Sequence, residues 1–262
     1  MKKNRALRPS AIALALGSLL AAPAARALDF ADLFGKGGYA SDIRVNDLGY
    51  QLTSGSYKAG STIIGYAAPG SVLQFGGDFT TNTFTLGYYS GADGFYGLYG
   101  GSLGTTNAQI GKDAAGTFNN ISGLHFNGGL LSIGQAAGGT SPASVYAVGS
   151  VGNLSSERIT VNAQGTYRQD GGVALVFGGA FTVAGGGTGA LNAGTLQVQR
   201  ESLTIEAGAR NVATLLVELG DRWPGCIGEL TGEVAIGALL SRSLYNLEVA
   251  ARAEAQRLEA NA

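Results

Sequence analysis

Charged side chains are almost missing from the central part of this chain. The 98 residues from Ala59 to Ser156 carry only Asp78, Asp93, Lys112 and Asp113, whereas about a quarter of residues are charged in ordinary globular domains. The same stretch is rich in glycine, threonine, serine and asparagine rather than in aliphatic residues. This composition is typical of neutral β-structure. It lacks the clustered lysine and arginine that a nucleic-acid surface needs.

Cysteine and histidine are each present once, as Cys226 and His125. A single cysteine cannot form an intramolecular disulfide, and its apolar neighbours favour a buried thiol over a functional one. Metal sites built on paired histidines or cysteines are excluded, and any Ser-His-Asp or Cys-His arrangement would have to use His125. His125 alternates with Leu124 and Phe126, so we expect it to face solvent on a strand.

Patterns of acidic residues that carry chemistry are also missing. The few carboxylates of the β-rich region show no pairing that would support glycoside hydrolysis, and no closely spaced calcium-binding motif occurs. We therefore expect no enzymatic activity, no cofactor and no bound metal.

Long apolar runs are absent as well, so no transmembrane helix of about 20 residues is predicted. The longest such run, residues 11–22, follows Lys2, Lys3, Arg5 and Arg8 and precedes Ala25-Arg26-Ala27. This is the pattern of a cleavable signal peptide over residues 1–27. With no twin-arginine pair and no nearby cysteine for a lipid anchor, we expect export by the general secretory route, to the extracellular space or the outer cell surface. The periplasm is the alternative.

Removal of residues 1–27 takes away five of the 17 basic groups and none of the 18 acidic ones. The 12 basic groups that remain, against 18 acidic ones, give a net charge of −6. A mildly acidic chain without a basic stripe is unsuited to nucleic acid or to anionic membrane surfaces.

The features that are present indicate β-structure. Short segments such as residues 83–88, 124–126, 158–163 and 195–205 alternate apolar and polar residues, and glycine pairs separate them. Alternation with a period of two is typical of half-buried strands, and glycine pairs are typical of tight turns. We therefore predict a mainly β fold: a single glycine-rich antiparallel domain over residues 59–237, arranged as a sandwich or barrel.

A β-solenoid is the alternative architecture. The phrases FNGGLLSIG (126–134) and FGGAFTVAG (177–185) look alike, because each places two glycines between apolar segments. No fixed repeat period links them to the rest of the chain, so the solenoid is the second choice.

Both flanks of the β-rich region are predicted to contain a helix. Residues 28–58 form a short N-terminal helix, with apolar residues on one face before Gly35, and a lead-in of mixed polarity. Residues 238–262 lack glycine and proline and carry an apolar stripe at helical spacing. They predict an amphipathic C-terminal helix.

Aromatic residues gather in one part of the β-rich region and form the candidate ligand or contact surface. Aromatic rings can stack on sugars, and the glycine turn at residues 91–94 would present them. The competing interpretation is that these rings fill the core. The candidate residues are Tyr88, Tyr89, Asp93, Phe95, Tyr96 and Tyr99.

Composition and targeting together favour a secreted or cell-surface structural or adhesive protein of a Gram-negative-type bacterium. Such a protein would associate with itself, as in an extracellular filament or matrix, or with other components of the cell surface. The alternatives are an outer-membrane β-barrel protein and an exported carbohydrate-binding module whose partner is a polysaccharide.

Overall fold

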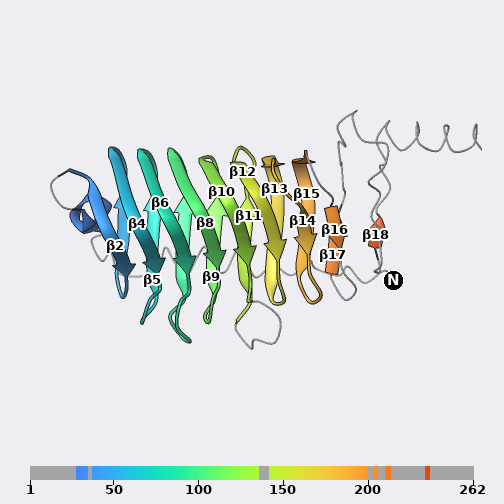
Figure 1. Cartoon of the computed structure of the whole chain (residues 1–262), viewed down its shortest axis with the longest axis horizontal. Helices are drawn as coiled ribbons and strands as arrows, with labels where there is room; N and C mark the ends of the chain where they lie inside the picture. Colours follow the sequence, from blue (N-terminus) through green and yellow to red (C-terminus); the bar gives the residue numbers. More distant parts are fainter. Residues whose placement is uncertain are drawn as a thin grey trace, which may run out of the picture.

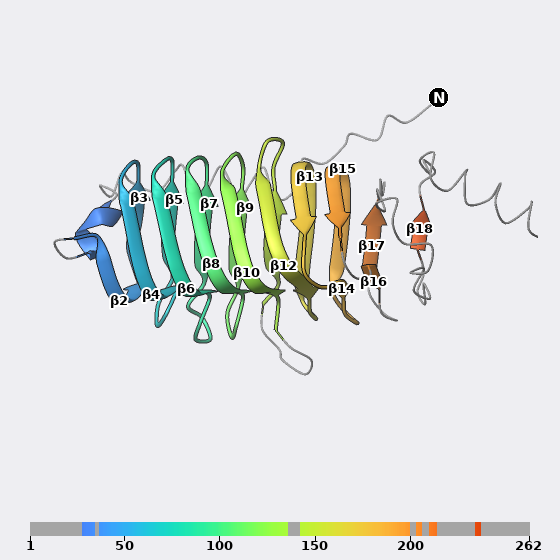
Figure 2. The same cartoon turned by 45° about the horizontal axis from the view of Figure 1, so that its top comes forward.

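The protein is mainly β and its strands are parallel. The computed structural model describes residues 28–34, 37–135, 142–199, 203–205, 210–213 and 234–236. In that part of the chain, eighteen strands and one short 3-10 helix, η1, form a stack of about eight coils (Figures 1 and 2). In this architecture, a parallel β-solenoid, successive coils stack along one long axis.

The elements of the N-terminal half are β1 (Leu28–Asp29), η1 (Phe30–Leu33), β2 (Tyr39–Val45), β3 (Gly49–Leu52), β4 (Ser56–Ile64), β5 (Gly70–Gln74), β6 (Asp78–Leu86), β7 (Gly94–Leu98), β8 (Ser102–Ile110) and β9 (Gly116–Asn120). Those of the C-terminal half are β10 (Leu124–Ile133), β11 (Ser144–Val148), β12 (Asn153–Val161), β13 (Gly165–Val176), β14 (Phe181–Val183), β15 (Thr188–Val198), β16 (Leu203–Ile205), β17 (Arg210–Ala213) and β18 (Val234–Ile236).

Each coil has three straight segments, which we name by face. Face 1 holds the short strands β3, β5, β7, β9 and β11, which pair in parallel one coil apart. The longer strands β4, β6, β8, β10 and β12 bend in the middle, and their first halves form face 2 and their second halves face 3. In β6 the bend lies at Asn82 and Thr83, two exposed residues in succession that interrupt the alternation of buried and exposed side chains.

The coils are equivalent but not equal in length. The first residue of face 2 in each coil pairs directly with the first residue of face 2 in the next coil. These residues are Ser56, Asp78, Ser102, Leu124, Asn153, Val173 and Thr195. They lie 20 to 29 residues apart. Because the spacing varies, the sequence shows no fixed repeat period.

The predicted antiparallel sandwich or barrel is therefore wrong, although the mainly β composition is confirmed. The prediction treats the glycine pairs as hairpin turns, which reverse the chain within one sheet. In the structure the glycines lie at corners, where the chain passes from one face to the next and then pairs with the coil before it. The two similar phrases at 126–134 and 177–185 lie on the same side of the solenoid, because Leu131 pairs with Ile159 and Ile159 with Phe181.

Glycine is required at the corners by close packing of the backbone. At Gly94, at the start of β7, an added Cβ atom would lie 2.2 Å from the Ile64 carbonyl oxygen of the preceding coil. At Gly87, at the end of β6, φ is +69°, a conformation that L side chains rarely adopt. The high glycine content of the chain is thus a consequence of tight corners repeated in every coil.

The interior is filled by columns of like side chains, one from each coil. Tyr96, Phe118, Tyr146 and Tyr167 lie in one column and are fully buried. Phe118 stacks on Tyr96 at 5.3 Å and on Tyr146 at 4.7 Å between ring centroids. Burial of an aromatic side chain stabilises a fold by about 1.5–3 kcal/mol through the hydrophobic effect alone, so this column is a main source of cohesion between coils.

The predicted N-terminal helix is replaced by a strand and one helical turn. β1 pairs with β3, and Asp29 caps η1 by accepting a hydrogen bond from the Ala31 N–H. Phe30 and Phe34 then pack on Phe79 and Tyr57, which fills the interior at the N-terminal end of the stack (Figure 1, left). The signal peptide predicted over 1–27, the helix predicted over 238–262 and Cys226 lie outside the described residues.

Candidate functional site

The structure separates the six residues of the predicted aromatic surface. Tyr96 belongs to the core, where it donates a 2.5 Å hydrogen bond to the Gln74 side-chain oxygen. Burial raises its pKa well above the usual value. Tyr96 is thus a structural residue, in agreement with the competing interpretation from the sequence.

Phe95 and Tyr99 lie on the outside of face 1, near the corner that leads to face 2. Tyr99 stacks on Phe75 of the preceding coil, with ring centroids 5.3 Å apart. Both Phe95 and Tyr99 border Gly97, whose missing side chain leaves room for them. They form a small aromatic contact on the surface, separate from Tyr88 and Tyr89.

Tyr88 and Tyr89 lie at another corner, in the connection between β6 and β7 that leads from face 3 to face 1. The backbone ladder continues through this corner, since the Tyr88 N–H donates to the Gly65 carbonyl and the Lys112 N–H to the Gly87 carbonyl. Tyr66, Tyr88 and Lys112 therefore occupy the same position in three successive coils. The Asn46 side chain fixes the first of these loops by accepting hydrogen bonds from the N–H groups of residues 66, 67 and 68.

We call Arg44, Tyr66, Tyr88, Tyr89 and Lys112 the corner cluster. The three tyrosine rings contact one another, with centroids 4.8 to 5.4 Å apart. The Arg44 guanidinium lies 4.4 Å from the Tyr66 ring centroid, and the Lys112 ammonium lies 3.6 Å from that of Tyr88. Each cation–π contact of this kind contributes about 0.5–1 kcal/mol at an exposed site, so the cluster holds its rings in place without burying them.

Tyr89 is the most exposed ring of the cluster, with 48% of its surface accessible. A side-chain hydrogen bond with Tyr66 raises the pKa of Tyr89, and so does the negative charge that Tyr66 would carry. Tyr89 is therefore protonated at neutral pH and can donate or accept a hydrogen bond. Asp93, the remaining predicted residue, ends the same loop, and its carboxylate accepts a hydrogen bond from the Ala115 N–H of the next coil.

His125 is buried, so the prediction that it faces solvent is wrong. Its side chain points into the solenoid, stacks on Phe118 at 5.0 Å and contacts the Tyr146 hydroxyl and the Thr105 hydroxyl. The sequence pattern was misread because Leu124 and Phe126, its apolar neighbours, are the exposed residues of this strand.

A chain of hydrogen bonds fixes the protonation state of His125. The Thr105 hydroxyl donates to the Asn127 side-chain oxygen, and the Asn127 amide donates to the Gly129 carbonyl and to Ser156. Because Thr105 has only one proton to give, His125 must donate to it from Nε2 and accept from the Tyr146 hydroxyl at Nδ1. Burial lowers the pKa of His125 to about 3. This network satisfies polar groups inside the coil and has no access to a substrate.

A second surface feature is an apolar patch on face 2. Leu124 and Phe126 lie two coils before Val173 and Leu175 at equivalent positions, and the coil between them carries Asn153 and Ser155. Phe177 follows β13 and stacks on Phe126 across this coil, with centroids 5.8 Å apart and nearly parallel planes. Phe126 is 49% exposed. We call Leu124, Phe126, Val173, Leu175 and Phe177 the Phe126 patch.

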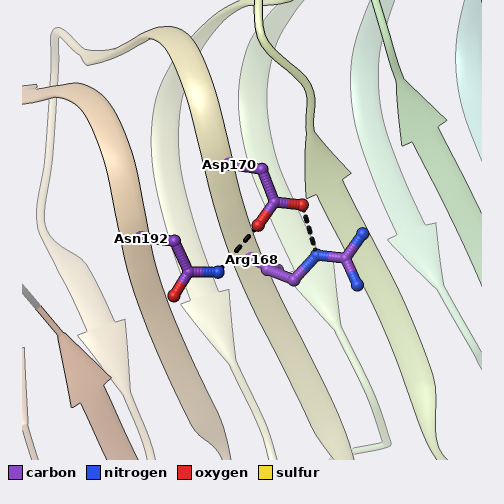
Figure 3. Close-up of polar contacts among 3 residues, drawn as sticks. All are labelled: Arg168, Asp170 and Asn192. Atoms are coloured by element: carbon purple, nitrogen blue, oxygen red, sulfur yellow. Dashed lines mark hydrogen bonds and ion pairs between the residues drawn. The ribbon is translucent and has the colours of Figure 1, made fainter. Parts of the chain in front are cut away.

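The charged side chains in the part of β13 that pairs with β11 on face 1 stabilise the contact between two coils and do not form a binding site. Arg168 and Asp170 of β13 form an ion pair at 2.7 Å, and Asn192 of the next coil donates a 2.7 Å hydrogen bond to the same carboxylate (Figure 3). The three side chains link two adjacent coils. An exposed pair of this kind contributes about 0–1 kcal/mol.

Two other features are absent from the part of the chain that the structure describes. Among the described residues, no three His, Cys, Asp or Glu side chains lie together as a metal site would need. In the same part of the chain, no helix has the length and apolar character required to cross a membrane.

The fold and these surfaces define a parallel β-solenoid that carries an aromatic–cation cluster at one corner and an apolar patch on one face. Neither family models, nor curated proteins, nor solved structures gave a match to this chain. Its function therefore has to be inferred from its own residues.

The sequence contains a repeated pattern that predicts part of the corner cluster. Apolar residues precede a corner glycine in Ile64-Gly65, Leu86-Gly87, Ile110-Gly111 and Ile133-Gly134. The residue after each glycine falls in one column, which adds Tyr66 and Lys112 to Tyr88. Arg44 had no such signal, because its contact with Tyr66 depends on how the loop turns.

Proposed function

We propose that the protein is an exported structural or adhesive protein of the cell surface, which associates laterally with further copies of itself through the Phe126 patch. The observation that carries the proposal is this exposed apolar patch on a solenoid whose other outward residues on face 2 are mostly polar. Equivalent positions in neighbouring coils hold Lys58, Thr80 and Gln197. Exposed apolar surface that is rimmed by polar residues marks interaction sites.

Three further features support a second copy as the occupant of the patch. Stacked coils produce a long flat face that can align with the same face of another molecule. Glu157 and Arg158, at the bend of β12 beside Phe177, have opposite signs, so two copies meet with little net electrostatic repulsion. The N-terminal end of the stack is filled by Phe30 and Phe34, which favours side-by-side over end-to-end association.

Sedimentation velocity of the purified exported chain tests the association. We expect wild type to associate as concentration rises and Phe126→Ser to need about tenfold or more higher concentration, because burial of a phenylalanine contributes about 1.5–3 kcal/mol. Phe75→Ser is the matched control, since Phe75 is 47% exposed but lies outside the patch, at the corner between β5 and β6. A monomeric wild type, or equal effects of the two substitutions, contradicts the proposal.

Cell fractionation tests the location separately. We expect the protein in the culture fluid or on the outer surface, where added protease reaches it in intact cells. Recovery in the cytoplasm would refute the export on which the proposed function depends.

A further inference from the structure

We infer that the corner cluster is a binding site for an uncharged polysaccharide, with Tyr89 as the stacking platform. This inference deepens the adhesive role and rests on the proposed function for its biological setting. The site is distinct from the Phe126 patch, so the two can be tested independently.

The corner cluster brings together cations, which are rare in this part of the sequence. Residues 39–120 contain only three cations, Arg44, Lys58 and Lys112, and two of them lie over tyrosine rings at the same corner. The three tyrosines contribute nothing to the buried aromatic column. Four successive coils thus place aromatic rings and cations together on the surface, in a region otherwise poor in cations.

The geometry leaves Tyr89 accessible while its neighbours hold it in place. Its ring is nearly perpendicular to that of Tyr88, with an interplanar angle of 87°, and inclined by 61° to that of Tyr66. The hydroxyl interacts with Tyr66. A ring held on two sides loses little side-chain entropy when a ligand binds to it, which favours affinity.

The chemistry of the cluster suits a sugar chain. The apolar face of a pyranose can lie on a tyrosine ring, and its hydroxyl groups can bond to the phenol, guanidinium and ammonium groups around it. Between Arg44 and Lys112 the cluster covers three steps from coil to coil, about 14 Å at the usual strand spacing. That length matches several sugar units better than a single one.

The local charge balance favours an uncharged chain over an acidic one. Arg44 and Lys112 are accompanied on the loops of this corner by Asp47, Asp93 and Asp113. The Asp93 and Asp113 carboxylates accept hydrogen bonds from Ala115 and Gln135. With three carboxylates beside two cations, the corner has no excess positive charge to attract a polyanion.

Native gel electrophoresis of the full exported chain, in gels that contain a soluble polysaccharide, tests this inference. The probes are hydroxyethyl cellulose, glucomannan, xyloglucan and dextran as uncharged chains, and alginate as an acidic chain. We expect wild type to be retarded by at least one uncharged chain. Tyr89→Ala should weaken that binding about three- to tenfold, the loss expected for one aromatic contact.

Two controls separate recognition from folding and assembly. Phe75→Ala removes an equally exposed ring from another corner and should bind as wild type does. Arg44→Gln should weaken binding, because it removes a charged hydrogen-bond donor and the cation–π contact with Tyr66. Phe126→Ser should retain full binding, so loss of association alone leaves the inference intact. The inference is overturned by wild type that no uncharged chain retards, by retardation in alginate only, or by equal losses in Tyr89→Ala and Phe75→Ala.

Discussion

At the scale of single residues, His125 shows how a solenoid interior uses a polar side chain. It replaces the apolar residue found at the equivalent position in other coils, such as Phe79, Leu103 and Leu154. Its two nitrogens are fully engaged by Tyr146 and Thr105. The imidazole is thus held neutral, and folding disfavours its protonation.

This burial predicts a specific pH dependence of stability. The pKa of His125 falls from an ordinary 6.5 to about 3 on folding, so the unfolded chain binds more protons between those values. Stability is therefore fully present above pH 6.5, falls by up to about 1.4 kcal/mol per pH unit below it, and levels off near pH 3. Urea denaturation at a series of pH values measures this slope.

The variant His125→Gln supplies the control, because glutamine keeps hydrogen-bonding groups but does not titrate. Carboxylates contribute equally to both proteins near pH 4, so the difference between the two curves isolates the histidine. As His125 is the only histidine of the chain, no second imidazole interferes. Parallel curves for the two proteins between pH 5 and 7 would show that His125 is not buried as described.

At the scale of elements, the corners determine whether strands can stack. Gly94 and Gly91 belong to the same connection between β6 and β7 but face different constraints. A Cβ atom at Gly94 would meet the backbone of the preceding coil, whereas at Gly91, where φ is +81°, nothing lies within 4 Å. Gly94 is needed because there is no space for a side chain, and Gly91 is needed only because of its backbone conformation.

Alanine substitutions at these two positions should therefore differ in cost. Gly91→Ala should lower the free energy of unfolding by about 1–2 kcal/mol, the cost of a left-handed conformation. Gly94→Ala should cost about 3 kcal/mol or more, since two backbones must move apart. Urea titration of both variants gives the comparison, and a Gly94→Ala variant as stable as Gly91→Ala would contradict close packing at this corner.

The same corners explain what could be predicted from sequence. Alternating segments such as Thr83–Leu86 were recognised as strands because period-two burial depends only on neighbours along the chain. The prediction of antiparallel pairing is wrong because glycine occurs both in hairpin turns and at the corners of a solenoid. Tyr88 and Tyr89 were identified by their local density, but Tyr66, one coil away, becomes their neighbour only through the register of the stack.

At the scale of the whole molecule, scarcity of charge determines how copies should interact. In the part of the chain that the structure describes, Arg168 and Asp170 pair with each other on face 1, so they do not require a charged partner from a second copy. Association through an apolar patch does not depend on Coulombic attraction, and excluded salts such as sulfate strengthen apolar burial.

Lateral association should accordingly be unchanged by added sodium chloride and strengthened by sodium sulfate. Sedimentation velocity at low and high concentrations of each salt checks both expectations. Dissociation in sodium chloride would instead indicate that charged groups hold the copies together, because salt screens exposed charges.

The unequal coil lengths have a consequence for how such a chain can change. The coil from Leu124 to Asn153 is 29 residues long and the next, to Val173, is 20, yet β10 and β12 pair on both sides of a single bulge between Asn127 and Leu130. Extra residues are therefore accommodated in a bulge or in a connection, and the pairing resumes after them. Connections away from the closely packed corner glycines are places where evolution or an engineer can graft a new loop, so the faces can stay constant while the connections acquire new specificities.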